Sequence, residues 1–200
     1  MSQLTRIAFF TAVLFLAGCI TFHAVPPGEP SFAGMTVTTE STWNQAPRQW
    51  IRRMRSDAQA WTQNGLLLDR ILFIPAIAPG ETVFRELSGQ DALPAFDANM
   101  LPNEIEELVE SSIAKLFGEG GAVVETSGLR PHRFGDDRGL MFDLSVSVSD
   151  GPDYRGVTGA FVAEERLYLI VYLAVTPHYY DKYRDEAVAI IQSARIPGEA

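Results

Sequence analysis

The stretch that decides the fold is LMFDLSVSVS at residues 140–149. Every second residue is aliphatic or aromatic, and the residues between them are mostly serine and aspartate. This alternation predicts a β-strand with one buried face and one wetter face, because successive side chains of a strand point to opposite sides. Turn-forming clusters flank the stretch, GDDRG at residues 135–139 and DGPD at residues 150–153.

Two further strands are predicted after this one, at residues 155–163 and 166–175, with the polar pair Glu164 and Glu165 between them. Connections this short join antiparallel neighbours, since a parallel crossover needs a dozen residues or more. The three strands therefore form a predicted antiparallel meander.

The last of these strands is apolar on both faces: residues 167–175 have the sequence LYLIVYLAV. Much of 66–77 is similar, and it follows Asn64 and Gly65, a strong hairpin signal. A strand that is apolar on both faces must be covered on both faces. The pattern thus predicts a sheet with a layer on either side.

Two amphipathic helices are predicted to supply these layers. Residues 102–117 place apolar side chains on one stripe, begin with proline and acidic residues, and precede Gly118. Residues 181–196 carry a second apolar stripe and end before Pro197. The predicted fold class is α+β, an antiparallel sheet flanked by helices in an α-β-α sandwich.

This order of elements resembles the PsbP/Mog1-type α-β-α sandwich. The resemblance rests on a helix between early and late strands, the late meander, and a closing helix that contains IIQSA at residues 190–194. It implies binding and scaffolding roles around larger assemblies, mostly without catalysis. Because it concerns element order and no functional motif, no site residue follows from it.

The amino-terminal segment has a different character. A short polar stretch with one cation, Arg6, precedes the apolar run IAFFTAVLFL at residues 7–16. This run has the length of a signal-peptide core and is too short for a membrane-spanning helix, which needs roughly 20 residues. Small residues then lead to the only cysteine of the chain, in the order Leu16, Ala17, Gly18, Cys19.

This segment resembles a bacterial lipoprotein signal with its lipobox at residues 16–19. The resemblance implies cleavage between Gly18 and Cys19, a diacylglycerol thioether on Cys19, and acylation of the new terminal amine. Ile20 follows the cysteine, where aspartate is associated with inner-membrane retention, so the resemblance favours the outer membrane and the periplasm. The alternatives are a plain signal peptide or a buried amino-terminal helix with an accidental cysteine.

The predicted organisation has three parts. Residues 1–18 are a signal peptide that is removed, residues 19–34 are a lipidated tether rich in proline and glycine, and residues 35–200 are one globular domain. The tether prediction depends on Pro26, Pro27 and Pro30 and on the lack of an apolar period over residues 21–34.

Composition limits the classes of partner and cofactor. The net charge of −9 argues against nucleic acid and against a broad electrostatic grip on anionic lipid. With Cys19 assigned to lipid, the mature chain has no cysteine left for a disulfide or a thiolate zinc site. No cofactor is predicted other than the covalent lipid on Cys19, and no metal.

One cluster reverses the sign of this charge. Arg48, Arg52, Arg53 and Arg55 surround Trp50, and Trp43 and Trp61 bracket them. Arginine binds phosphate or carboxylate through two parallel hydrogen bonds, and tryptophan offers an amphipathic contact. The cluster is a candidate docking patch for lipid phosphate, an anionic glycan or an acidic partner. The alternative is a solvated loop whose arginines pair with nearby carboxylates and whose tryptophans are core residues.

Two other groups of polar and aromatic residues have either a functional or a structural role. His178, Tyr179, Tyr180 and Tyr183 precede or begin the last helix and either line a pocket or pack the helix onto the sheet. His132, Asp136 and Asp137, with Arg133 and Arg138, either form a hydrolytic or metal site or belong to turns. No nucleophile elbow, zinc-protease motif or phosphate-binding glycine loop occurs in the sequence.

The sequence therefore predicts a membrane-anchored periplasmic lipoprotein domain of non-catalytic binding or scaffolding type. Its partner is expected to be an envelope protein, glycan or lipid. Two alternatives stay open: an envelope hydrolase that uses a dispersed His, Asp and Ser site, and a carrier of a small lipid.

Overall fold

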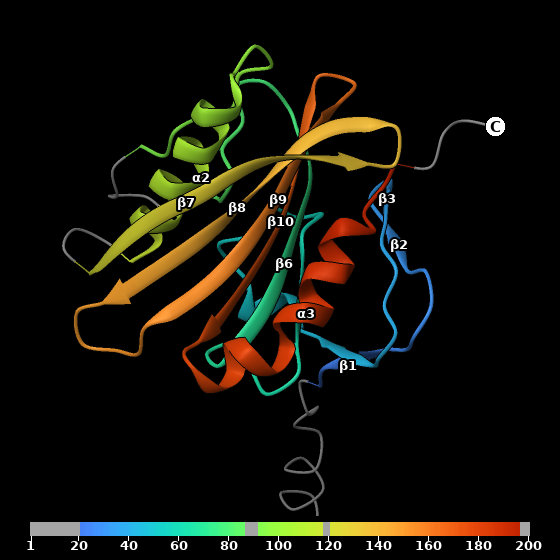
Figure 1. Cartoon of the computed structure of the whole chain (residues 1–200), viewed down its shortest axis with the longest axis vertical. Helices are drawn as coiled ribbons and strands as arrows, with labels where there is room; N and C mark the ends of the chain where they lie inside the picture. Colours follow the sequence, from blue (N-terminus) through green and yellow to red (C-terminus); the bar gives the residue numbers. More distant parts are fainter. Residues whose placement is uncertain (1–20, 87–91, 118–120, 197–200) are drawn as a thin grey trace, which may run out of the picture.

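The computed structural model describes residues 21–86, 92–117 and 121–196. Figure 1 shows a strongly twisted antiparallel sheet with helix α2 on one face and helix α3 on the other. The strand order is β1-β4-β5-β6-β10-β9-β8-β7, and a small hairpin, β2-β3, lies apart from it. The predicted α+β sandwich is confirmed.

The elements have the following bounds: β1 (His23–Val25), β2 (Ser31–Phe32), β3 (Met35–Thr36), β4 (Trp43–Gln45), the short 3-10 helix η1 (Arg48–Trp50), β5 (Gln59–Thr62), β6 (Asp69–Ile77), α2 (Pro102–Leu116), β7 (Ala122–Phe134), β8 (Asp137–Val148), β9 (Tyr154–Ala163), β10 (Arg166–Val175) and α3 (His178–Gln192).

Strand β10 explains the two-layered core. Leu169 and Val171 point into the layer that also contains α2, whereas Ile170 and Tyr172 point into the layer that contains α3. All four are buried. Because side chains alternate across a strand, a run that is apolar at every position supplies both layers at once. The predicted meander is also confirmed, since β9 pairs with β8 and β10 in antiparallel register.

The two helices follow the predicted stripes with one displacement. Helix α2 begins at Pro102, and Glu104 accepts a hydrogen bond from the Leu101 N–H at 2.6 Å, which caps its first turn. Helix α3 begins three residues before the predicted position and ends at Gln192. It ends early because Arg195 pairs with Thr36 in a two-way backbone bridge of 2.9 and 3.0 Å.

The prediction that residues 21–34 form an extended tether is wrong, because parts of this segment pair with the globular domain. Strand β1 hydrogen-bonds to β4 at the edge of the sheet, and Val25 is buried. Gly28 exchanges two backbone hydrogen bonds of 2.9 Å with Thr39. Phe32 packs edge-on against Phe73 in the core, with ring centroids 5.1 Å apart. The prolines interrupt the apolar period, but the few apolar side chains between them still fill the core.

The turn expected at residues 135–139 is shorter in the structure, and His132 and Asp137 lie outside it. These residues belong to a long hairpin in which His132 lies on β7 and Asp137 begins β8. Only Gly135 and Asp136 form the turn, and Gly135 adopts a φ of 61°, which suits glycine in a tight hairpin. No helix within the described ranges is both long and apolar enough to cross a membrane.

Candidate functional site

The arginine cluster lies between β4 and β5, in a segment held to the body by its apolar residues. Ile51 and Met54 are buried beneath it, and the Met54 N–H donates to the Ile51 carbonyl at 2.9 Å. The η1 turn places Trp50 outward, with 56% of its surface exposed. Trp43 and Trp61 instead lie fully in the core. The three tryptophans of the sequence pattern therefore have two different roles.

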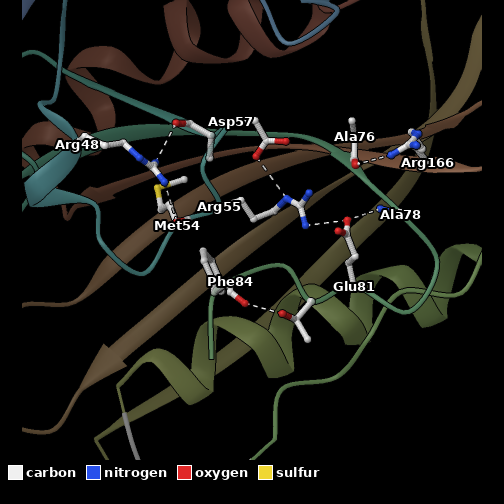
Figure 2. Close-up of polar contacts among 11 residues, drawn as sticks. Arg48, Met54, Arg55, Asp57, Ala76, Ala78, Glu81, Phe84 and Arg166 are labelled. Carbon is white, nitrogen blue, oxygen red and sulfur yellow. Dashed lines mark hydrogen bonds and ion pairs between the residues drawn. The ribbon is translucent and has the colours of Figure 1, made fainter. Parts of the chain in front are cut away.

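Arg55 has a structural environment. Its guanidinium lies between two carboxylates, 2.8 Å from Glu81 and 3.5 Å from Asp57 (Figure 2). A hydrogen bond from the Ala78 N–H, together with the nearby Arg55 charge, lowers the pKa of Glu81. Arg55 thus joins its own loop to the turn at residues 78–81, which removes it from the candidate docking patch.

Arg48 lies on the surface, and its guanidinium donates to the carbonyls of Met54 and Ala58 at 3.2 and 3.4 Å (Figure 2). These bonds orient the side chain and leave its charge without a carboxylate partner within the described part of the chain.

Arg52 and Arg53 are also free of carboxylates within residues 21–86, 92–117 and 121–196. Arg52 is exposed. Arg53 is half-buried and makes one long contact of 3.5 Å to the Leu116 carbonyl, while its Nε atom is buried and lacks a hydrogen-bond partner.

The structure adds an arginine that the sequence pattern missed. Arg85 lies beside the cluster, because its N–H donates to the Arg53 carbonyl at 2.7 Å. Its side chain lines a hollow of about 400 Å³ together with Arg48, Gln49, Arg52 and Glu86. We call the surface formed by Arg48, Arg52, Arg53 and Arg85 with the neighbouring Trp50 the arginine face.

An apolar groove of about 380 Å³ adjoins the arginine face. Trp50, Arg52 and Arg53 line it, together with Leu67, which is 77% exposed. The remaining lining residues are mostly aliphatic or aromatic: Ile51, Met54, Leu66, Leu72, Phe84 and Leu116, with Gln49 and Arg70. The site thus combines cations with an adjoining apolar surface.

Arg70 is another cation that lines this groove. Its guanidinium lies 5.2 Å from the centre of the Tyr154 ring and donates to the Leu66 carbonyl at 2.6 Å. Burial lowers the pKa of Arg70, but arginine starts so high that the group stays charged at neutral pH. Arg70 therefore adds a third positive charge to the groove, beside Arg52 and Arg53.

A third hollow, of about 470 Å³, connects the arginine face to the beginning of the described chain. Thr21 and His23 line it together with Arg48. Beside it, the ring of Phe22 packs edge-on against Trp50, with centroids 5.3 Å apart. The chain therefore enters the body next to the arginine face. Gly18, Cys19 and Ile20 themselves lie outside the described residues.

The aromatic group at the start of α3 has a packing role. Tyr180 is buried and stacks on Tyr172, whose hydroxyl donates to the carbonyls of Tyr179 and Tyr180 at 3.1 and 3.2 Å. Burial raises the pKa of Tyr172. His178 is exposed and contacts the edge of the Tyr179 ring. These contacts hold the helix on the sheet.

The His132 group is dispersed along its hairpin. His132 packs edge-on against Phe134, with centroids 4.7 Å apart, and Arg133 donates to the Asp136 carbonyl at 3.0 Å. Asp136 and Arg138 are exposed. Neither His132 nor His178 lines any of the three hollows described above. Within the described ranges, no group of three His, Cys, Asp or Glu side chains is arranged to hold a metal ion.

No protein-family model and no curated protein matches this sequence. Among solved structures, the chain is similar to the solution structure of cyanobacterial PsbP (CyanoP) from Synechocystis sp. PCC 6803. The TM-score is 0.59 at 8% sequence identity, and the match covers 90% of this chain and 95% of that one. The PsbP-type architecture predicted from element order is therefore confirmed, at the level of the fold alone.

Proposed function

We propose that this protein is a lipid-anchored, non-catalytic binding domain of the bacterial cell envelope. In this proposal, Cys19 carries the lipid, the body faces the periplasm from the outer membrane, and the arginine face is the binding surface. The PsbP-type fold is consistent with a binding or scaffolding role. The proposal assigns no catalytic residue, metal or cofactor.

The observation that carries the proposal is a cluster of four neighbouring arginines without carboxylate partners in the described structure, on a chain of net charge −9. In the same part of the structure, Arg55 pairs with carboxylates. Arg48, Arg52, Arg53 and Arg85 do not. Guanidinium groups left in this state are suited to phosphate or carboxylate groups of another molecule.

The shape of the site favours a large partner over the two alternatives. A hydrolase would place a histidine and a carboxylate together in a concave site. His132 and His178 line none of the three hollows, and the hollow that His23 lines has no carboxylate among its lining residues. A small-lipid carrier would enclose its cargo, whereas the groove beside Trp50 lies at the surface, with Trp50 and Leu67 exposed on it.

Crosslinking in intact envelopes, followed by purification of the protein, tests the proposed function. The wild-type chain is expected to capture an envelope component, and a variant with Arg52→Glu and Arg85→Glu is expected to lose it. Arg138→Glu is the matched control, because it reverses an exposed charge on the distant β7–β8 hairpin. Equal capture by all three proteins would remove the arginine face as the binding surface.

The anchor requires a separate test. Cys19→Ala should abolish incorporation of a fatty-acid probe and release the protein from the membrane fraction, because stable anchoring needs the acyl chains. Probe incorporation into the Cys19→Ala variant would contradict the lipid assignment.

A further inference from the structure

We propose that the arginine face rests on the phosphate headgroups of an anionic membrane, namely the bilayer that holds the anchor. This inference rests on the proposed function, because a domain without the Cys19 lipid would not be held near that surface. The inference adds to the proposed function what the arginine face binds and how the domain is oriented on the membrane.

The first argument is charge complementarity. Arg48, Arg52, Arg53 and Arg85 present guanidinium groups that no described carboxylate neutralises. Glu86 is the acidic residue in the same hollow, and its carboxylate accepts a hydrogen bond of 3.0 Å from the Leu93 N–H. Lipid phosphates offer the paired oxygens that guanidinium groups bind.

The negative net charge of the whole chain does not oppose this contact. Charges in physiological salt are screened beyond about 8 Å, so a phosphate at the arginine face is influenced mainly by the groups next to it. The contact is local, unlike the broad electrostatic grip that the net charge of −9 disfavours.

The second argument is the position of the anchor. Thr21 and Arg48 line the same hollow, and Phe22 contacts Trp50. Cys19 precedes Thr21 by two residues, and two residues of extended chain span at most about 7 Å. Strand β1 then fixes the following segment to the sheet. A lipid on Cys19 would therefore hold the membrane surface close to the arginine face.

The third argument is the character of the exposed apolar side chains. Trp50 and Leu67 both border the groove next to the arginines. Tryptophan favours the boundary between headgroups and acyl chains, where its ring is half solvated. Arginine places its apolar stem in the same boundary and its charge at the phosphates. Leucine, tryptophan and arginine therefore match the acyl chains, the boundary region and the phosphates of one bilayer surface.

Trp50 also supplies the measurement. Lipidated protein is reconstituted into vesicles that contain anionic phosphatidylglycerol, with acyl chains brominated near the headgroup to quench tryptophan at short range. Trp43 and Trp61 have no exposed surface and provide the background emission. A Trp50→Phe variant measures that background directly.

The expected result is the loss of most of the Trp50 emission in brominated anionic vesicles. The loss should be smaller in vesicles of pure phosphatidylcholine. It should also be smaller in anionic vesicles at 1 M salt, where the screening length falls to about 3 Å. The variant with both Arg52→Glu and Arg85→Glu should show the same reduction. Arg138→Glu should behave as wild type. All of these proteins should remain bound to the vesicles through the lipid.

Three outcomes would overturn the proposal, and they are distinguishable. If the protein floats with the vesicles but Trp50 emission is unchanged by bromination, the anchor stands and the arginine face points elsewhere, toward an acidic partner. If the purified native protein carries no lipid and does not float, the proposed function fails as well. Equal quenching in phosphatidylcholine and phosphatidylglycerol would contradict the role of the arginine charges.

Discussion

The two faces of the sheet are covered in different ways. Helix α3 packs against β9 and β10 on one face, and its residues Ala187, Ile190 and Ile191 are buried in a continuous aromatic and aliphatic layer. On the other face α2 packs chiefly against β7, and the remaining cover comes from loop residues such as Ile51, Met54 and Phe84. The apolar groove lies where the loop cover meets Leu116 at the end of α2. A surface assembled from separate segments leaves gaps between them, and the groove is one of these gaps.

The largest effect should come from the continuous layer. Ile191 is fully buried, and its Cγ2 atom lies 2.5 Å from where a Cβ on Gly159 would be, so helix and strand pack closely there. Ile191→Ala is expected to lower the free energy of unfolding by about 3 kcal/mol, measured by urea titration. Leu67→Ala, in the exposed groove, should change it by less than about 0.5 kcal/mol. Equal effects would show that the two faces do not differ in this way.

A smaller effect is expected for the polar link between α3 and β4. The Glu186 carboxylate accepts hydrogen bonds from the Ser41 hydroxyl and from the Trp43 indole N–H, the second at 2.9 Å. Glu186→Ala leaves the buried indole donor unpaired and should cost about 2 kcal/mol, also measured in urea. Asp185→Ala is the control, because the Asp185 side chain is 94% exposed. If the Glu186→Ala protein were as stable as the control, the hydrogen bonds of Glu186 would not stabilise the packing of α3.

On the loop-covered face, the Arg55–Glu81 pair should give a weak pH dependence. The pKa of Glu81 is lowered in the folded protein, so its contribution is present above the ordinary glutamate pKa and is lost as pH falls through the lowered value. Because the Glu81 side chain is 44% exposed, solvent screening keeps this contribution below about 1 kcal/mol.

The measurement is urea unfolding of wild type and Glu81→Gln at neutral pH and at a pH below the ordinary glutamate pKa. The difference between the two proteins should shrink in acid. Glu165→Gln, at an exposed turn, is the control for the loss of an acidic side chain. A Glu81→Gln difference that grows in acid would contradict the sign of the shift.

The smallest effect on stability should come from the arginine face. Arg52 is exposed and makes no hydrogen bond or ion pair with the residues that the structure describes. Arg52→Glu should therefore leave the free energy of unfolding within about 0.5 kcal/mol of wild type. A larger loss would mean that Arg52 supports the fold, and its role in binding would then need a different argument.

The sequence predicted the sheet because β10 is apolar from Leu167 to Val175, a pattern expected of a strand that is covered on both faces. It missed β7, since Val124 and Phe134 are its only buried residues and the polar side chains between them resemble a loop. It also treated residues 21–34 as a stalk, because two- and three-residue strands are too short to show a period.

The candidate site was predicted only in part. The cluster around Trp50 is local in sequence and could be found there, whereas Leu67, Arg70 and Arg85 join it through the tertiary fold. Nothing in the sequence distinguishes the exposed Trp50 from the buried Trp43 and Trp61. Nor does it distinguish the paired Arg55 from Arg52, because Glu81 comes from a distant turn.

The junction between the two ends of the body has a consequence for folding. Ser193 accepts a hydrogen bond of 2.7 Å from the Thr38 N–H, between residues 155 positions apart. The entropy lost in closing a loop rises with its length, so this contact is costly until the strands between have formed. A chain in the course of synthesis lacks this contact until Ser193 has been added, so the link between α3 and Thr38 forms late in folding.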